Sequence, residues 1–486
     1  MNLTLLEAIM GRFLMIYGVI LLIPITVAFN YNDSSNTILS FALTSLLTVS
    51  IGIILYIKGR IDSQMGVREG FVVVAGIWIL ASVIGAIPFY ASGSVTNFFD
   101  ALFETTSGFT TTGASVISNL EILPQSILFW RSLTHWLGGL GIIVLFIILL
   151  PRFGMGAVHL FHTEVPGPMN QKAFPKIRDE ARVLWLIYLG LTSLEVLLLK
   201  FAGMSLFDAV NHSFSTLATG GFSTRTASIT DFNSLAIELI IVFFMVLAGM
   251  NFNLYIQAWR RGPSNVMLDL EFKVYILLLL GATSIIVITL IQQSGFTLGI
   301  ALRQSLFQVV SITTTTGFVT ADFDQWPGLA KAILFFLMFT GGSAGSTAGG
   351  LKLIRIILLV KMGWNGLKQS LHPRLITSIV IQEKTVDAPV LTGISRYFFL
   401  FIAIFIVSSL LLAATGLEPF DAMSASIATL GNVGPGFGVV GPVANYASIN
   451  AFGKVVLSTC MLLGRLELFA LLVFLQSEFW RYSQRW

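Results

Sequence analysis

The segment Thr-Thr-Thr-Thr-Gly-Phe, residues 313–318, is one of four related short segments in a chain of 486 residues. The other three are TTTG, ending at Gly113, ATGG, ending at Gly221, and GNVG, ending at Gly434. Each of these three follows a Phe-Asp-Ala tripeptide, and its glycine lies thirteen residues after the aspartate. In the remaining segment Gln304 takes the aspartate's place at the same distance from the glycine. This constant spacing predicts a fourfold internal repeat.

The composition places this repeat in a membrane. Hydrophobic residues make up 55% of the chain and charged residues 11%, whereas charged residues make up about 25% of an average soluble domain. The single cysteine, Cys460, lies in an apolar run, which excludes a disulfide framework and a cysteine metal site. A soluble enzyme is effectively excluded, and we expect an all-α integral membrane protein.

Apolar runs of about 17 to 25 residues, the length that spans a bilayer, recur along the whole chain. Lysine and arginine gather in alternate connections between these runs, while the connection at 92–126 contains neither. Basic connections face the cytoplasm, so we expect both termini on the cytoplasmic side. The ten expected spans are 13–29, 38–57, 71–91, 127–150, 183–202, 235–257, 273–292, 331–360, 396–415 and 451–475.

The repeat and the spans together predict a simple plan of five units. An extra amino-terminal pair of spans comes first, and each later unit is a span, an outer loop with a matched glycine, and a second span. The thirteen residues before each glycine are too few to cross the membrane, so the loop must dip in and return. Irregular backbone at that depth is tolerated where protein buries it or it lines a wet cavity. The units are 1–66 (the extra pair), 67–162, 163–262, 263–376 and 377–486 (repeats one to four).

The loops suit a monovalent cation. Asp100, Asp208 and Asp421 are expected to be the N-caps of short helices whose carbonyl ends point inward and favour cations. The backbone after each helix would expose carbonyl oxygens, which replace the hydration shell of the ion in potassium filters. Thr/Gly clusters are also ordinary turns, but four equally spaced copies favour a filter, and the absence of carboxylates argues against a divalent ion. The expected filter residues are Thr110, Thr111, Thr112, Gly113, Ala218, Thr219, Gly220, Gly221, Thr314, Thr315, Thr316, Gly317, Gly431, Asn432, Val433 and Gly434.

With four span–pore loop–span repeats and one filter glycine per loop, the chain resembles the Trk/Ktr/HKT superfamily of potassium transporters. The extra amino-terminal pair and the length resemble its bacterial TrkH branch. The resemblance covers essentially the whole chain. Gly113 is similar to the glycine of potassium-selective members, where sodium-selective relatives can carry serine.

The resemblance implies a potassium-permeable, channel-like subunit of the bacterial cytoplasmic (inner) membrane, with potassium as the transported ion and no bound cofactor. It also implies a homodimer governed by a cytosolic, nucleotide-binding TrkA ring. That partner would dock on the cytoplasmic segments, 152–182 and 361–395. Contacts with membrane lipid are expected, and no nucleic-acid partner.

The second span of the third repeat differs from the other second spans, which we expect to be simple helices. Its first ten residues from Gly341 hold five glycines and three hydroxyl residues. Each glycine costs a helix about 1 kcal/mol relative to alanine, so this stretch should unwind just below the filter, held by few packed contacts. Close helix packing explains one or two glycines but not this density, and the resemblance implies a loop that obstructs the pore. The expected gate residues are Gly341, Gly342, Ser343, Ala344, Gly345, Ser346, Thr347, Ala348, Gly349 and Gly350.

Arg465 is the other expected gate residue. A charge within the last span is costly and normally faces a partner or water. Glu467 lies two residues on and would face elsewhere on a helix, so it is not the expected partner. The resemblance implies a pore arginine beside the loop, and we expect Arg465 to raise the barrier for cations and to donate to loop carbonyls. No role follows from the sequence for Arg131 and His135.

Two other functions stay open. Residues 341–345 fit the G-x-S-x-G pattern of a serine hydrolase, although that pattern requires a strand-to-helix turn and none of the five histidines is clearly placed at its depth. A proton- or sodium-coupled potassium symporter is the second alternative, but such transporters commonly have inverted repeats and ionisable groups at the substrate site. Channel-like passage of potassium, without enzymatic activity, is the favoured interpretation.

Overall fold

The computed structural model describes residues 1–60, 65–139, 177–375, 378–381 and 384–480, and these are mostly helical. Within them the strands are β1 (Val380–Ile381) and β2 (Lys384–Thr385), an antiparallel pair. The α-helices are α1 (Leu3–Ile20), α2 (Ile23–Tyr31), α3 (Ser35–Lys58), α4 (Val67–Ala91), α5 (Phe98–Phe109), α6 (Gln125–Gly139), α9 (Ile177–Phe201), α10 (Leu206–Leu217), α11 (Leu235–Ala248), α12 (Phe252–Arg261), α13 (Ser264–Leu268), α14 (Leu270–Ser294), α15 (Leu298–Thr313), α16 (Gly328–Leu337), α17 (Leu353–Leu371), α18 (Ala388–Ala413), α19 (Pro419–Leu430), α20 (Ala451–Arg465), α21 (Phe469–Leu472) and α22 (Ser477–Trp480).

Six helical stretches in the described residues are long and apolar enough to cross a membrane, and two bent helix pairs raise the number to as many as eight. The six are α1 with α2, then α3, α4, α9, α14 and α18. They coincide with predicted spans one, two, three, five, seven and nine, which confirms a multi-pass, all-α membrane protein. The predicted span 127–150 begins as α6, and its remainder lies outside the described residues, as does most of the segment 152–182.

The second spans of three repeats are broken, which corrects the prediction that only the third is interrupted. The axes of α11 and α12 bend by 86° at their junction, and those of α20 and α21 by 113°. In the third repeat, α16 ends at Leu337 and α17 begins at Leu353. At the α20–α21 break Glu467 and Leu468 have positive φ angles of 56° and 45°. This conformation is costly for residues other than glycine. Neither of the two positions is a glycine or a proline, so the break could not be recognised there from the residue types.

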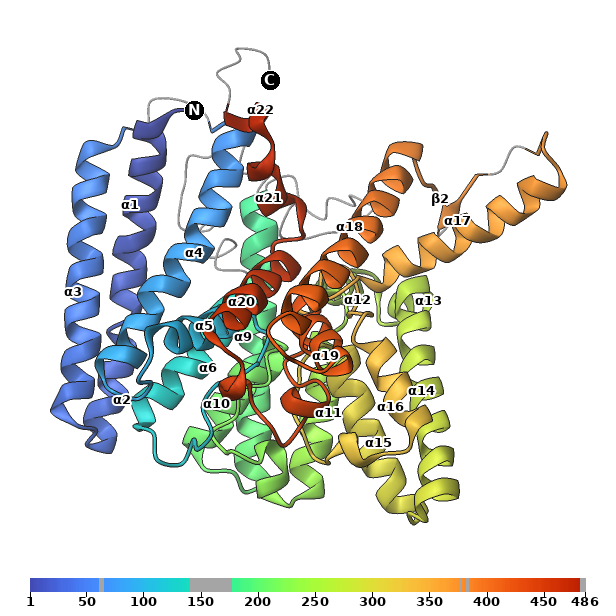
Figure 1. Cartoon of the computed structure of the whole chain (residues 1–486), viewed down its shortest axis with the longest axis horizontal. Coiled ribbons are helices and arrows are strands. Elements are labelled where there is room, and N and C mark those ends of the chain that lie inside the picture. The colour runs from blue at the N-terminus through green and yellow to red at the C-terminus, as the bar shows by residue number, and fades with distance from the viewer. Residues whose placement is uncertain (61–64, 140–176, 376–377, 382–383, 481–486) are drawn as a thin grey trace.

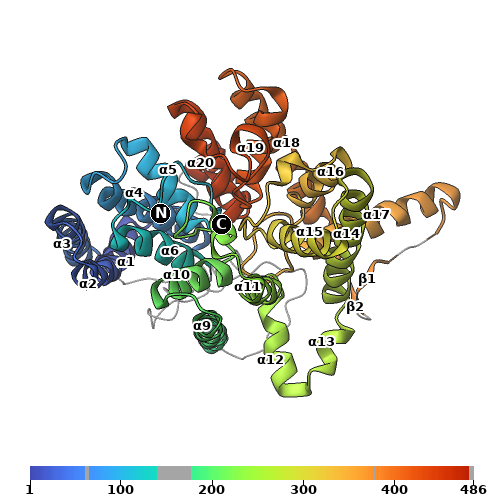
Figure 2. The ribbon, with the colours of Figure 1, turned by 90° about the horizontal axis from the view of Figure 1, so that it is seen from below.

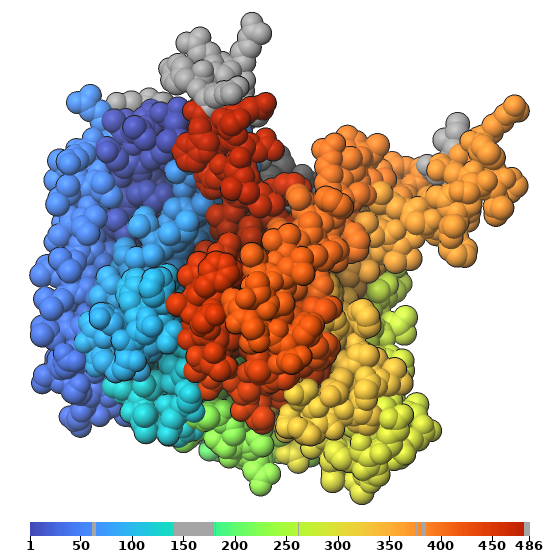
Figure 3. All heavy atoms as spheres, in the orientation of Figure 1, coloured from blue at the N-terminus to red at the C-terminus, as the bar shows by residue number. Residues whose placement is uncertain are grey.

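The short helices α5, α10, α15 and α19 occupy the middle of the molecule, and the longer helices surround them (Figure 2). The hairpin of α1 and α3 stands at one edge, and the start of α1 lies at the same end of the molecule as α22 (Figure 1). At the opposite edge α17 projects from the body (Figure 3).

The N-caps of α5, α10 and α19 are not the predicted aspartates. They are Asn97, Ser205 and Glu418. Asp100, Asp208 and Asp421 instead lie in the first helical turn, where a carboxylate still complements the positive end of the helix dipole. Ser205 Oγ donates to Asp208 Oδ2 at 2.7 Å, and the amide of Asp208 donates back to that hydroxyl at 3.0 Å. Asp208 therefore stabilises the start of α10 from within the first turn, in an arrangement similar to a capping box.

Glycines allow α1 and α3 to pack closely. A Cβ atom at Gly11 would lie 2.5 Å from the backbone nitrogen of Tyr56, and one at Gly52 would lie 2.8 Å from that of Met15. Ser45 Oγ also donates to the carbonyl of Gly18 across the pair at 2.6 Å. Small residues and interhelical hydrogen bonds are the usual means of joining helices in lipid, where no hydrophobic force drives association.

This packing predicts that Gly11→Ala lowers stability, by about 1–3 kcal/mol, because the added methyl group overlaps the Tyr56 backbone. Thermal unfolding of the purified protein in detergent measures the loss. Gly190→Ala in α9 is the matched control, since its Cβ would meet nothing within 4 Å. A Gly11→Ala variant as stable as the control would contradict the close packing of α1 and α3.

Candidate functional site

The four central helices α5, α10, α15 and α19 end in the same turn. Two residues before each matched glycine the backbone is left-handed. The φ angles are 53° at Thr111, 54° at Thr219, 58° at Thr315 and 54° at Asn432. In each case the next amide donates to the carbonyl five residues back, as in a Schellman motif. These bonds are Thr112 to Ser107 at 2.9 Å, and Gly220 to Ser215, Thr316 to Ser311 and Val433 to Ala428, each at 2.8 Å. Positive φ is uncommon for threonine, so packing around the turns must impose it.

The matched glycines join the four turns into a ring. Their φ angles are 80° at Gly113, 75° at Gly221, 81° at Gly317 and 96° at Gly434. A Cβ atom on any of them would come within 2.1–2.5 Å of a carbonyl oxygen of the next segment. The pairs are Gly113 with Gly220, Gly221 with Thr316, Gly317 with Val433, and Gly434 with Thr112. Each segment thus contacts the next one along the chain, and the fourth segment contacts the first. Glycine alone satisfies both the backbone angle and the close approach.

The four carbonyl oxygens at these contacts accept no hydrogen bond from any described residue. Their residues, Thr112, Gly220, Thr316 and Val433, are all buried. A buried carbonyl without a donor is unusual, because more than about 90% of such groups are paired. The ring therefore presents a set of neutral oxygens that a ligand from outside the chain can satisfy.

The predicted filter residues, 110–113, 218–221, 314–317 and 431–434, make up these four segments. Their polar side chains contact one another. The Oγ1 atoms of Thr110 and Thr112 lie 2.8 Å apart, and those of Thr314 and Thr316 lie 2.7 Å apart. Asn432 in the fourth segment donates through Nδ2 to Thr112 Oγ1 at 2.9 Å. The segment without threonine is thus tied to the first segment by an amide.

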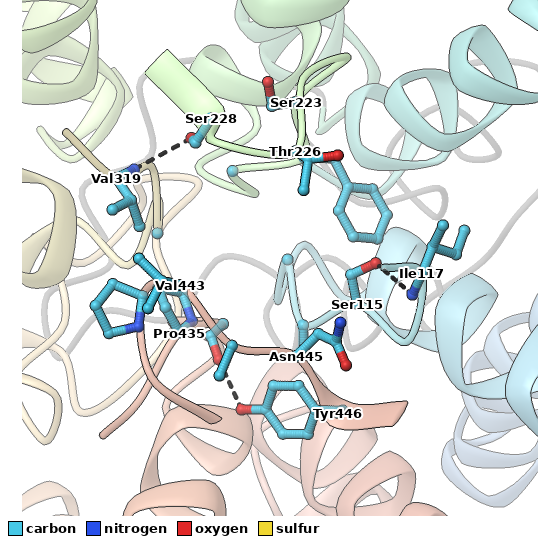
Figure 4. Close-up of a pocket in the computed structure, with 18 of the residues that line it drawn as sticks. Ser115, Ile117, Ser223, Thr226, Ser228, Val319, Pro435, Val443, Asn445 and Tyr446 are labelled. Carbon is cyan, nitrogen blue, oxygen red and sulfur yellow. Dashed lines mark hydrogen bonds between the residues drawn. The ribbon is translucent and has the colours of Figure 1, made fainter. Parts of the chain in front are cut away.

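On one side the ring opens into a cavity of about 150 Å³. All four matched glycines line it, together with the residues that follow each glycine. Four of the residues labelled in Figure 4, one from each repeat, surround an open centre: Ser115, Ser223, Val319 and Asn445. The lining contains no carboxylate among the described residues. An ion in this cavity would meet hydroxyl, amide and backbone groups, together with the side chains of Arg131 and Arg225, which pair with Glu104 and Asp208.

A buried ion pair, for which the sequence indicated no role, supports the wall of this cavity. Arg131 Nε lies 2.8 Å from Glu104 Oε1, and the two side chains are 2% and 0% exposed. Arg131 also donates to the carbonyl of Ser223 at 3.0 Å, while Glu104 accepts from Ser115 Oγ at 3.0 Å. His135 stacks on Phe222 with 4.0 Å between ring centres. The pair joins the first two repeats just beyond their glycines.

The predicted gate residues, 341–350, lie in the non-helical connection between α16 and α17. The amide of Gly349 donates to Thr315 Oγ1 at 2.8 Å. A Cβ atom at Gly349 would lie 2.7 Å from the carbonyl oxygen of Gly431. Thr315 and Gly431 belong to the helix-end side of the ring, whereas the matched glycines line the cavity. The connection, which we call the intramembrane loop, therefore lies on the side of the ring away from the cavity.

Many hydrogen bonds hold the intramembrane loop, which corrects the expectation that few contacts do so. The amide of Ser343 donates to the carbonyl of Gly249 at 2.9 Å, and Thr347 Oγ1 donates to that of Ala248 at 3.1 Å. Within the loop, the amide of Gly341 donates to the carbonyl of Leu351 at 2.8 Å. The glycines allow this because they let other backbones approach, so the same residues that prevent a helix also permit the anchoring.

Arg465, at the end of α20, reaches the intramembrane loop as predicted. Its guanidinium donates to the carbonyl of Thr347 at 2.7 Å and to those of Gly138 and Gly139 at 2.5 and 2.7 Å. Glu467 is not its partner and instead pairs with Arg355 at 2.5 Å. Arg465 thus places a positive charge between the loop and the end of α6, below the ring.

The serine of the G-x-S-x-G pattern has no catalytic neighbours among the described residues. Ser343 Oγ has no hydrogen-bond partner among these residues. In a serine hydrolase the pattern lies in a turn between a strand and a helix, whereas here it lies in the intramembrane loop. His135 and His212, which are described, contact Ser215 and Ser223 instead. The described residues also contain no group of three or more His, Cys, Asp or Glu side chains that could hold a metal ion.

The chain has close relatives among known proteins. The TrkH family model, described as "Cation transport protein", matches residues 37–482. The Trk system potassium uptake protein TrkH of Salmonella typhimurium is 40% identical, with 97% of this chain and 98% of that protein covered. TrkH of Halomonas elongata is 38% identical, with 99% and 100% covered. The crystal structure of the potassium transporter TrkH from Vibrio parahaemolyticus superimposes with a TM-score of 0.90 at 37% identity, covering 99% of this chain and 100% of that one.

The buried ion pair leads to a stability prediction. Arg131→Met leaves Glu104 buried without its cation, and we expect a loss of about 3–5 kcal/mol. The double variant Glu104→Leu/Arg131→Met removes both charges and should recover part of that loss. Thermal unfolding in detergent measures both variants. A double variant less stable than Arg131→Met alone would show that the charges are not mutually compensating.

Proposed function

We propose, because this chain belongs to the TrkH family of cation transport proteins, that it takes up potassium across the bacterial cytoplasmic membrane through a channel-like pore. The relatives from Salmonella typhimurium and Halomonas elongata, which align with this chain over nearly their whole length, are named potassium uptake proteins. In this proposal, residues 67–162, 163–262, 263–376 and 377–486 are four repeats around one pore, and residues 1–66 are an added pair of spans.

The ring of four unpaired carbonyl oxygens carries this proposal. Thr112, Gly220, Thr316 and Val433 each present one oxygen where consecutive segments meet. Neutral carbonyl oxygens replace the hydration shell of potassium in selective filters, whereas divalent ions normally require charged oxygen ligands. The four helices end at the ring, so the negative ends of their dipoles also favour a cation there.

The order of features along the proposed pore describes a closed state. A cation would pass from the cavity to the ring and then meet the intramembrane loop, which contacts Thr315 and lies against Gly431. The charge of Arg465 lies directly beyond, hydrogen-bonded to the loop at Thr347. The loop is the steric barrier and Arg465 the electrostatic one, so opening requires the loop to leave the ring.

Ion flux in proteoliposomes tests the proposal. The purified protein should pass potassium in preference to sodium, and its current should reverse with the potassium gradient alone at varied pH and sodium concentration. A reversal potential that follows the proton or sodium gradient would instead indicate the coupled symporter. Flux measured with and without the nucleotide-binding TrkA-type ring tests the proposed partner. The mass of the purified protein in detergent tests the proposed homodimer.

The ring predicts a specific effect of Gly113→Ala. The added methyl group would lie 2.1 Å from the carbonyl oxygen of Gly220 and displace it, so the potassium-to-sodium flux ratio should fall at least about tenfold. The matched control is Gly93→Ala, since Gly93 has a similar φ of 79° but nothing within 4 Å of its Cβ position. Equal flux ratios for the two variants would argue against a carbonyl filter at this ring.

Arg465→Ala should increase potassium flux severalfold, because it removes the positive charge and releases the carbonyl of Thr347. Arg465→Lys keeps the charge but loses the several hydrogen bonds of the guanidinium, and it should fall between the parent and the alanine variant. Tracer uptake into proteoliposomes measures all three. Unchanged or lower flux in a well-folded alanine variant would count against the barrier.

A further inference from the structure

A single carboxylate holds both ends of the intramembrane loop. Glu271 lies in the first turn of α14 and is 7% exposed. Its Oε1 accepts from the amide of Ala344 at 2.8 Å and from the amide of Ile354 at 3.0 Å. Ala344 is near the start of the loop, and Ile354 is in the first turn of α17 beyond its end. One oxygen atom thus bridges two backbone positions ten residues apart.

The local geometry favours a charged acceptor at this point. The amide of Ile354 is among the first N–H groups of α17, which have no acceptor within their own helix. An anion at that position also complements the positive end of the helix dipole. Glu271 itself is fixed by α14, a membrane span whose start is capped by Asp269, which accepts from the amide of Phe272 at 2.8 Å.

The bonds of the loop to Glu271 differ from its bonds to α11, and they resemble those that Arg465 and Lys352 donate to the loop carbonyls of Thr347 and Ala348. The bonds to Gly249 and Ala248 join neutral groups, whereas hydrogen bonds to an ionised carboxylate are roughly twice as strong. Among the described residues, Glu271 is the carboxylate that accepts from the backbone of this loop. It also acts from α14, the first span of the same repeat, and not from the ring that the loop covers.

We propose that Glu271 is a positioning residue that fastens the intramembrane loop against the ring. Movement of the whole loop away from the ring and from α14 breaks the bond to Ala344, to Ile354, or to both. This inference rests on the proposed function insofar as the loop obstructs the pore. The position of the loop is nevertheless measurable without ion flux, so the two proposals are separable.

Thiol accessibility measures the loop position. Ser346→Cys, in a background in which Cys460 is replaced by alanine, places the only cysteine of the chain on a half-buried loop residue. In proteoliposomes, Glu271→Ala should raise the rate of its modification by a small water-soluble thiol reagent about 10- to 100-fold, the range for losing one hydrogen bond to a charged group. Potassium flux through the same vesicles should rise with it.

Two further variants show that the carboxylate is responsible. Glu271→Gln keeps an oxygen acceptor without the charge, and its modification rate should lie between those of the parent and Glu271→Ala. Glu238→Ala is the matched control, because Glu238 is a buried carboxylate that pairs with Arg303, away from the loop. It should leave the modification rate at the parent value.

An unchanged modification rate in a folded Glu271→Ala protein would overturn the inference, whatever the flux. A raised rate with unchanged flux would support the fastening and reject the loop as the barrier of the proposed pore. If Glu271→Ala does not fold, Glu271→Asp gives the same test, since its charge remains but its shorter side chain cannot reach both amides. A rate at the parent value in Glu271→Asp would then reject the inference.

Discussion

The contact between a glycine of one segment and a carbonyl oxygen of the next is the constraint on which the centre of this protein depends. It occurs at Gly113, Gly221, Gly317 and Gly434, and each occurrence requires positive φ and no side chain. The helices before the glycines, the left-handed turns and the aspartates in the first helical turns serve to deliver the backbone to these points. A ring of this kind leaves its four carbonyl oxygens without donors among the described residues, and the proposed affinity for a cation rests on them.

Polar contacts between distant residues keep the ring in place from outside. Glu104 and Arg131 join two repeats at its cavity side, and Arg465 joins the intramembrane loop to α6 on the other side. Buried charges of this kind are costly unless every group has a partner. Glu104 and Arg131 satisfy each other, so removal of either leaves the other buried without its counter-charge, whereas Arg465 is satisfied by backbone carbonyls.

Much of this arrangement could be predicted from the sequence because it repeats. Equal spacing placed four helix ends and four glycines, and glycine density placed the intramembrane loop. The bends after α11 and α20 were missed, because the apolar runs continue across both bends. The residue types of Glu467 and Leu468 also do not indicate their left-handed backbone. The Glu104–Arg131 pair and the bonds of Glu271 to the loop were also missed. They join residues far apart in the chain, and no local pattern marks such partners.

The closing contact of the ring, from Gly434 back to Thr112, joins the last repeat to the first, and no short stretch of chain links them. Polar bonds concentrate at this joint. Lys454 Nζ lies 2.7 Å from Asp100, Asn432 donates to Thr112, and the amide of Tyr446 donates to the carbonyl of Ser115 at 2.9 Å. During synthesis the first three segments are complete long before α20 exists. The ring therefore cannot close before the final repeat has been made, and the proposed ion site is incomplete until then.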